Sequence, residues 1–299
     1  MAQVLISGGS GLVGKILSEK LKTKGFDVAI LSRTNKPGFK TYLWHPDKNQ
    51  IDPKAIQSSD YIIHLAGANI AEKRWTDSRK KLIRDSRVES ANLIFNELKK
   101  QKKELKAFIS ASAVGYYGAR TSDNIFAEEH SASDDFLGQT CLAWEQAAKQ
   151  FEEIGIRTVI IRTGVVLDKQ AGALSKMILP IKIGLGSAIG NGRQYMPWIH
   201  IDDLCELYIK AIEDNQMNGV FNAVTPDFQT NKSFTHILAK TLKKPFFLPN
   251  IPAFLLKLAL GEMSIILLQG SRVSADKLIE LGFTFKFPNL RSALKDLLK

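Results

Sequence analysis

The first fourteen residues place three evenly spaced glycines directly after a short apolar run. Residues 3 to 7 have the character of a strand, and Gly8, Gly11 and Gly14 follow at intervals of three. Apolar residues then recur with the period of a helix up to about residue 24. Gly8 lets the chain reverse, Gly11 lets backbone approach a pyrophosphate, and Gly14 lets the helix pack close to the strand. The sequence therefore predicts the strand, turn and helix of a dinucleotide-binding fold, with free amides at the helix start facing phosphates.

Strands and helices continue to alternate after this turn. The residue pattern predicts strands over 27–32, 41–45, 60–67, 106–112, 157–161 and 219–223. It predicts helices around Pro53 and over 77–100, 171–183, 202–213 and 231–242. The helix over 202–213 is expected to begin with an acidic N-cap. In the helix over 77–100, Leu82 is among the residues expected on the buried side. This order is typical of an α/β protein with a doubly wound parallel sheet, which binds its ligand at the carboxyl ends of the strands.

The second strand ends at Ser32-Arg33, where an NAD-binding protein would carry an acid for the adenosine ribose. An arginine there accommodates the extra phosphate of NADP, so we expect NADP(H) in preference to NAD(H). The alternative is that Arg33 only points to solvent. His64, within the fourth strand, is expected to be a packed core histidine.

Composition and charge limit the partners. Two cysteines argue against a disulfide framework, and with no leader before the first strand we expect a cytoplasmic protein. The net charge of +11 comes without a nucleic-acid motif, and its densest run, 99–106, closes a helix where cations are favourable. The longest apolar run, 251–268, is interrupted by Lys257, Gly261 and Glu262, so no membrane span is expected. We expect 254–268 to pack against the rest of the subunit, with a homodimer interface as the alternative.

Three motifs occur together in the first half of the chain: the glycine turn, His64-Leu-Ala-Gly67, and Ser110-Ala-Ser-Ala-Val-Gly-Tyr-Tyr-Gly118. Together they resemble the extended short-chain dehydrogenase/reductases, which include nucleotide-sugar epimerases and dehydratases. The stretches Arg162-Thr-Gly-Val-Val-Leu167 and 190–203 are similar to an atypical, epimerase-like branch with a small C-terminal domain. The resemblance implies a Rossmann-type domain over 1–244, with substrate-side segments from about 168, and a small helical domain over 245–299.

The resemblance also implies a set of cofactor-binding residues, which run from the pyrophosphate turn to the adenosine end and the middle of the cofactor. They are Gly8, Ser10, Gly11, Leu12, Val13, Gly14, Ser32, Arg33, Leu65, Ala66, Arg87 and Val166. A glycine-rich loop over 184–192 and the residues that follow it are expected to face the substrate. They could hold an anionic or sugar-like ligand through Arg193, Gln194, Trp198 and His200. The alternative for this loop is a structural crossover with Trp198 in the core.

The chain departs from the family at the residues that carry proton chemistry. Where the family has Tyr-x-x-x-Lys, this sequence has Leu137 and Cys141. A leucine has no proton to exchange, so any acid or base must come from elsewhere. The candidates are Ser112, Tyr116 and Tyr117, with His200 and Cys141 behind them, and each also has a purely structural interpretation.

The sequence thus favours an NADP(H)-binding oxidoreductase or epimerase that acts on a small molecule. The alternative is a non-catalytic binding or regulatory protein that responds to NADP(H), which the missing Tyr and Lys support. We expect a small-molecule substrate or ligand and no nucleic-acid or membrane partner.

Overall fold

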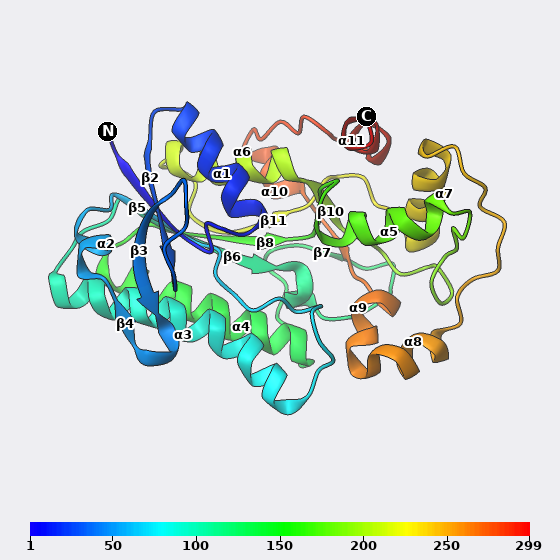
Figure 1. Cartoon of the computed structure of the whole chain (residues 1–299), viewed down its shortest axis with the longest axis horizontal. Coiled ribbons are helices and arrows are strands. Elements are labelled where there is room, and N and C mark those ends of the chain that lie inside the picture. The colour runs from blue at the N-terminus through cyan, green and yellow to red at the C-terminus, as the bar shows by residue number, and fades with distance from the viewer.

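The computed structural model describes all 299 residues and is built around one eight-stranded sheet (Figure 1). Its order is β11-β8-β6-β5-β1-β2-β3-β4, and every pairing is parallel except that of β3 with β4. The strands are β1 (Gln3–Ser7), β2 (Asp27–Ser32), β3 (Lys40–His45), β4 (Gln50–Ile51), β5 (Tyr61–His64), β6 (Ala107–Ala113), β8 (Thr158–Thr163) and β11 (Gly219–Ala223). The strand order reverses its direction between β1 and β5, which is where such sheets bind ligands. The expected doubly wound Rossmann-type sheet is confirmed.

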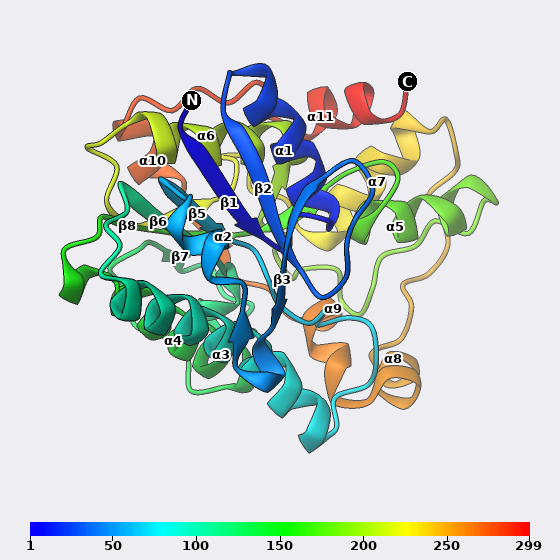
Figure 2. The ribbon, with the colours of Figure 1, turned by 60° about the vertical axis from the view of Figure 1, so that its left-hand side comes forward.

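Helices cover both faces of the sheet (Figures 1 and 2). Side chains of α1 (Leu12–Thr23) and α6 (Ile201–Glu213) share one apolar cluster with alternate residues of the strands. On the other face, α2 (Pro53–Gln57), α3 (Asp77–Gln101) and α4 (Phe136–Lys149) contribute to a second cluster. Each strand therefore buries both of its faces, which explains the near-continuous apolar runs of β1, β2 and β5 in the sequence.

A second lobe lies beyond the carboxyl ends of the strands (Figure 1). It contains the strand pairs β9 (Val165–Leu167) with β10 (Trp198–His200) and β7 (Ile125–Phe126) with β12 (Arg272–Val273). Its helices are α5 (Gly172–Lys182), α7 (Asn231–Thr241), α8 (Ala253–Leu260), α9 (Ile265–Leu268) and α11 (Leu290–Leu297), whereas α10 (Asp276–Glu280) lies beside β11 of the sheet. The C-terminal residues join existing clusters, because Leu278 packs with the sheet and Leu290 packs with α5 and α7.

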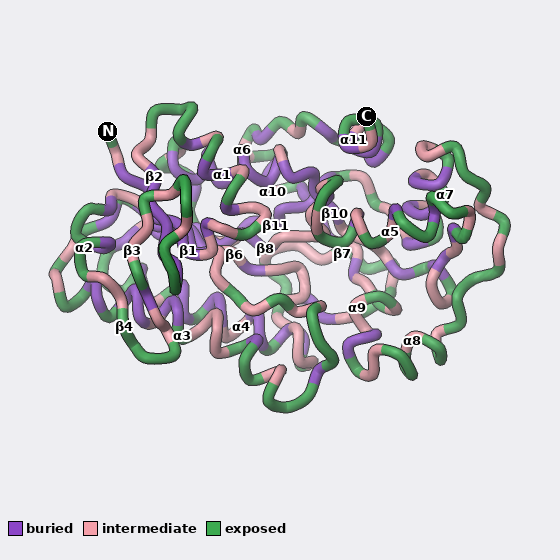
Figure 3. The backbone as a smooth tube through the Cα atoms, viewed as in Figure 1, coloured by how far each residue is buried: buried purple, intermediate pink, exposed green.

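Three local expectations need correction. The N-cap of α6 is His200 and not an acid, because its Nδ1 accepts a hydrogen bond from the backbone of Asp202 at 3.0 Å. On α3, Leu82 is 49% exposed and lies outside the buried stripe. The apolar helix α8 has no buried residue, and Phe254 and Leu258 are 66% and 76% exposed, so the packing expected for 254–268 is wrong for its first half (Figure 3). None of the helices is long and apolar enough to span a membrane.

Candidate functional site

The glycine turn between β1 and α1 is closed by its own backbone. Gly8 has a positive φ of 72°, and the amide of Gly11 donates to its carbonyl at 2.9 Å. A Cβ on Gly14 would lie 2.5 Å from the Cα of Gly9, so only glycine lets the helix start this close to the turn. Gly11 is exposed and is the N-cap of α1, with no side chain bonded to the first amides. The turn therefore offers uncapped backbone N–H groups at the positive end of α1.

The end of β5 lies directly beside this turn. A Cβ on Gly8 would approach the Leu65 carbonyl to 3.0 Å and the Ala66 nitrogen to 3.1 Å. His64 holds the ends of β1 and β5 together. Its Nδ1 is 2.7 Å from the Ser7 hydroxyl, and that hydroxyl accepts a hydrogen bond from the Ala66 amide. His64 is fully buried, as the sequence analysis expects, and burial lowers its pKa to about 4. A neutral imidazole therefore ties the ends of β1 and β5 together.

The end of β2 carries the two residues that the sequence assigns to the adenosine end. Register pairs Ser7 of β1 with both Leu31 of β2 and His64 of β5, so the three strands end at one edge. Ser32 is buried, and Arg33 is exposed and forms no ion pair. Leu12, the first residue of α1, and Val166 of β9 both pack against the first apolar cluster. The structure thus places these predicted residues around the carboxyl edge of the sheet.

Arg87 of α3 lies beside Gly67, which follows β5, on the face of the sheet that α3 and α4 cover. Its Nη1 donates to the carbonyls of Ala68 at 3.1 Å and Ile83 at 2.7 Å, and a Cβ on Gly67 would lie 3.0 Å from its Cζ. The guanidinium also lies 4.9 Å from the ring centre of Trp144 on α4. Arg87 has no carboxylate partner.

Two of the three proposed catalytic hydroxyls belong to a buried polar network. Arg162 and Glu145 form a two-bond ion pair, with both bonds at 2.8 Å and both side chains 2% exposed. Ser112 donates to Oε1 of Glu145 at 2.7 Å, and Tyr117 accepts from Arg162 at 2.9 Å while it donates to Asn222 at 2.8 Å. Burial raises the pKa of Tyr117 to about 12. Both hydroxyls are therefore occupied in holding the core together.

Tyr116 differs from its neighbours in this network. Its ring centre lies 3.4 Å from the Arg162 guanidinium carbon, its side chain is partly exposed, and no group of the protein bonds its hydroxyl. Of the three tyrosine and serine candidates, Tyr116 alone keeps a free hydroxyl.

Leu137 and Cys141, which stand where the family has Tyr and Lys, are both packed against other residues of the protein. Leu137 packs beside Trp75, Met263 and other residues of a small cluster that joins the start of α4 to the C-terminal segment. Cys141 is 6% exposed, and burial raises the pKa of its thiol to about 12. Burial therefore favours the protonated thiol over the thiolate, which makes Cys141 a poor general base.

Three of the four residues expected to face the substrate lie inside the protein. Trp198 is fully buried, with its Nε1 on the Asp227 carbonyl, and Gln194 is 2% exposed and bonds two backbone carbonyls. His200 caps α6, and its ring lies 3.9 Å from that of Phe287. A ligand cannot reach these three in this structure, so they act as structural crossover residues. Arg193 is exposed.

Residues 4–223 match the model of the "NAD dependent epimerase/dehydratase family", and residues 251–297 match a "Domain of unknown function (DUF1731)". The chain belongs to the NAD dependent epimerase/dehydratase family. The first match covers the glycine turn, α1 and all of the central sheet except Gln3 of β1.

Several known proteins are similar to this chain over nearly its whole length and nearly their own. The mouse epimerase family protein SDR39U1 is 34% identical over 98% of this chain and 99% of its own, and an epimerase family protein of Staphylococcus haemolyticus is 35% identical over 100% and 99%. The crystal structure of human SDR39U1 (isoform 2) with NADPH is 33% identical and superposes with a TM-score of 0.89, covering 99% of this chain and 98% of that one. A UDP-glucose 4-epimerase from Thermotoga maritima, 17% identical with a TM-score of 0.78 over 99% and 98%, shares the fold.

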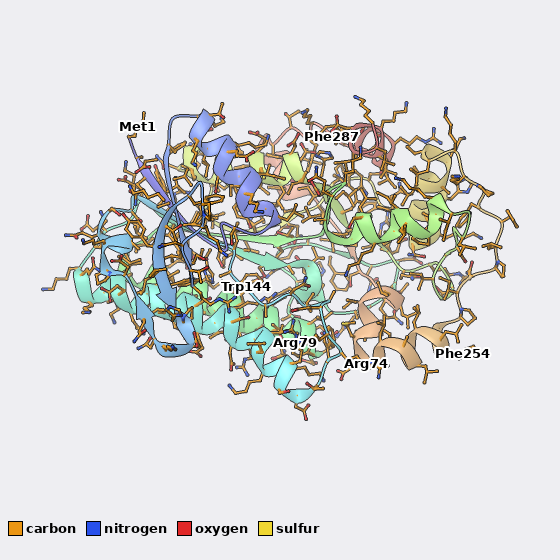
Figure 4. The ribbon with its side chains drawn as sticks, in the orientation of Figure 1. Met1, Arg74, Arg79, Trp144, Phe254 and Phe287 are labelled. Atoms are coloured by element: carbon orange, nitrogen blue, oxygen red, sulfur yellow. The ribbon has the colours of Figure 1, made fainter.

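Sequence reasoning missed three residues of the site. Glu145 and Arg162 are 17 positions apart, and nothing in that spacing predicts that they pair. Trp144 of α4, which Figure 4 labels, has no role assigned from the sequence. Its Nε1 is buried without a partner. The one available signal was charge, because a glutamate and an arginine within apolar segments need partners once buried.

Proposed function

We propose that this protein binds NADP(H) across the carboxyl edge of its sheet and acts as an oxidoreductase or epimerase on a small molecule. The observation that carries the proposal is the pairing of the uncapped α1 terminus with the end of β5, where a Cβ on Gly8 would meet Leu65. The residues present fit a dinucleotide: Gly11 leaves room for a pyrophosphate at the helix start, and no side chain occupies that place.

The preference for NADP(H) is supported by the end of β2. Arg33 is exposed and free of any carboxylate, and no acid follows β2 to bond ribose hydroxyls. The human relative SDR39U1, whose structure contains NADPH, is in line with this preference.

When bound, the nicotinamide cofactor supplies the hydride chemistry. The chain must then hold the cofactor and move a proton. Because Ser112 and Tyr117 are engaged and Cys141 is a neutral buried thiol, we assign the proton to the hydroxyl of Tyr116, which has no partner and is partly exposed.

The first test is a titration with NADPH and NADH, followed by tryptophan quenching and nicotinamide fluorescence. We expect NADPH to bind at least about tenfold more tightly, equivalent to about 1.4 kcal/mol. Arg33→Ala should remove this preference, whereas Lys149→Ala, an exposed lysine without an ion pair at the end of α4, should leave it unchanged. Equal affinity for both cofactors would refute the role of Arg33, and failure to bind either would refute the proposed function.

A second function is favoured by a specific observation. Leu137 packs in an apolar cluster and Cys141 is a buried thiol, so the usual proton-transfer pair is absent and nothing replaces it at those positions. This suits a binding or regulatory protein whose interactions change with NADP(H). Turnover of NADPH against a broad panel of carbonyl compounds separates the two functions: loss of turnover in Tyr116→Phe with unchanged NADPH affinity supports the enzyme, and no turnover in the wild type supports the regulator.

A further inference from the structure

The outer end of the second lobe, where α5, α7 and α8 lie, displays apolar side chains to solvent (Figures 1 and 2). On α8, Phe254, Leu255 and Leu258 are all exposed, and their spacing places them on one face of the helix. Phe254 lies at the outer margin of the lobe (Figure 4). Large apolar side chains gathered in this way mark a surface that binds something.

A neighbouring segment brings further apolar side chains to the same end. The amide of Ile251 donates to the carbonyl of Ala188 at 2.8 Å, so residues 185–190 lie beside residues 245–251. Both segments carry exposed apolar residues, which continue the exposed face of α8. We call this set the apolar tip, and it consists of Leu185, Phe247, Ile251, Phe254, Leu255 and Leu258.

The exposed helix is held firmly on its other side. Arg74, in the loop before α3, donates to the carbonyl of Leu258 at 2.7 Å and to that of Ala259 at 2.9 Å. Leu260, the last residue of α8, packs against the small cluster that contains Trp75. The apolar face of α8 is therefore presented outward by an anchored helix.

The charges around the apolar tip have a single sign. The chain contains 30 Asp and Glu residues, yet residues 172–200 and 228–261, which include α5, α7 and α8, contain none. Every lysine and arginine of these two stretches is exposed and forms no ion pair with a carboxylate. They are Lys176, Lys182, Arg193, Lys232, Lys240, Lys243, Lys244 and Lys257. The tip is thus surrounded by unneutralised positive charge, which attracts an anionic partner.

Apolar surface and positive charge together select the kind of partner. A symmetric contact with a second copy would place the same lysines against one another, which opposes association. A protein partner forms about one hydrogen bond per 100–200 Å² of interface, and the outward face of α8 offers only hydrocarbon and Lys257. An anionic lipid surface requires only apolar side chains that enter the acyl boundary and cations at the depth of the head groups.

We propose that the apolar tip inserts into the surface of an anionic lipid bilayer, with the lysines of α5, α7 and α8 at the head groups. The sequence analysis expects no membrane partner because no apolar run is long enough to span a bilayer. A helix that lies on a bilayer needs only a displayed apolar face and neighbouring cations. Binding of this kind does not depend on a cofactor in the crevice.

The test is co-sedimentation of the full chain with vesicles of phosphatidylcholine alone, or of phosphatidylcholine mixed with anionic phosphatidylglycerol. We expect binding to the anionic vesicles to be at least about tenfold tighter. The double variant Phe254→Ser, Leu258→Ser should bind them at least about tenfold more weakly, and Lys243→Gln, Lys244→Gln at least about threefold more weakly.

A matched control removes the same amount of charge at the opposite end of the molecule. Lys48 follows β3 and Lys54 lies in α2, and both are exposed and form no ion pair (Figure 1). The variant Lys48→Gln, Lys54→Gln should keep its affinity for anionic vesicles within about twofold of wild type, because these lysines are far from the tip. Midpoints of thermal unfolding measured without vesicles report that each variant is folded.

Several results would overturn the proposal. They are failure to bind anionic vesicles, equal binding to neutral ones, and equal losses in the control and in Lys243→Gln, Lys244→Gln. Wild-type binding by a folded Phe254→Ser, Leu258→Ser variant would also overturn it, because the protein would then adsorb by net charge alone. An oligomer that forms without vesicles and that Phe254→Ser, Leu258→Ser abolishes would assign the tip to a second copy instead.

Discussion

The ion pair between Arg162 and Glu145 allows a quantitative prediction about stability. Both side chains are 2% exposed, and Glu145 accepts two bonds from Arg162 and one from Ser112. Removing one member of a buried pair leaves an uncompensated charge and typically costs about 3 to 5 kcal/mol. Glu145→Gln keeps the shape of the side chain and one acceptor oxygen, so we expect a loss near the lower limit, about 3 kcal/mol of the free energy of unfolding.

The loss can be measured by urea unfolding against two comparison variants. Ser112→Ala removes a single hydrogen bond to the carboxylate and should cost about 1.5 kcal/mol. Glu213→Gln removes the acid of an exposed pair with Lys24, whose side chains are 40% and 48% exposed, and should change stability by less than about 0.5 kcal/mol. If Glu145→Gln is no less stable than Glu213→Gln, the reasoning about the buried pair is refuted.

Three further predictions follow from burial and backbone geometry. Burial lowers the pKa of His64 from 6.5 to about 4, so between these pH values the unfolded chain binds a proton that the folded chain does not. The free energy of unfolding should therefore fall by up to about 3 kcal/mol as the pH drops from 6.5 to 4. Urea unfolding of His64→Gln should show a weaker dependence on pH over this range. Gly14→Ala places a Cβ 2.5 Å from the Gly9 Cα, so it should lower the free energy of unfolding by about 2 kcal/mol and weaken NADPH binding. In the control variant Gly115→Ala the new Cβ meets only ordinary contacts of 3.5 Å and more, and the loss should be less than about 0.5 kcal/mol. Phe254→Ser on exposed α8 should leave the midpoint of thermal unfolding nearly unchanged. Replacing Met263, which is 7% exposed in the cluster with Trp75, by alanine should lower the free energy of unfolding by about 2 kcal/mol. An equal loss in both variants would mean that α8 is covered in solution.

The sheet was predictable because its signals are local. A buried parallel strand needs a continuous apolar run, and β2 and β11 have the predicted bounds to the residue. The predicted acidic N-cap of α6 was wrong for a physical reason. The acids at 202 and 203 favour a cap, but it is Nδ1 of His200 that accepts the hydrogen bond from the Asp202 amide. Helix starts depend on which side chain reaches the amides, and the composition of the first turn does not decide this.

The candidate site was predictable only where backbone defines it. The glycine turn depends on close approaches that no other residue allows, so its spacing was visible in the sequence. The hydroxyls of Ser112 and Tyr117 could not be assigned in the same way, because their partners come from α4, β8 and β11. Their availability depends on tertiary packing, and no local pattern records it.

The buried pair also bears on the chemistry that the family fold can support here. The Arg162 guanidinium that Glu145 fixes in place lies against the ring of Tyr116, the one candidate hydroxyl that remains free. An arginine held by two carboxylate bonds has little freedom to move, so it holds the stacked phenol in a defined orientation. The same acid that occupies Ser112 thereby positions Tyr116, so Glu145→Gln should lower any Tyr116-dependent turnover even at temperatures where the variant is fully folded. If that variant, while folded, turned over as the wild type does, the pair would serve stability alone.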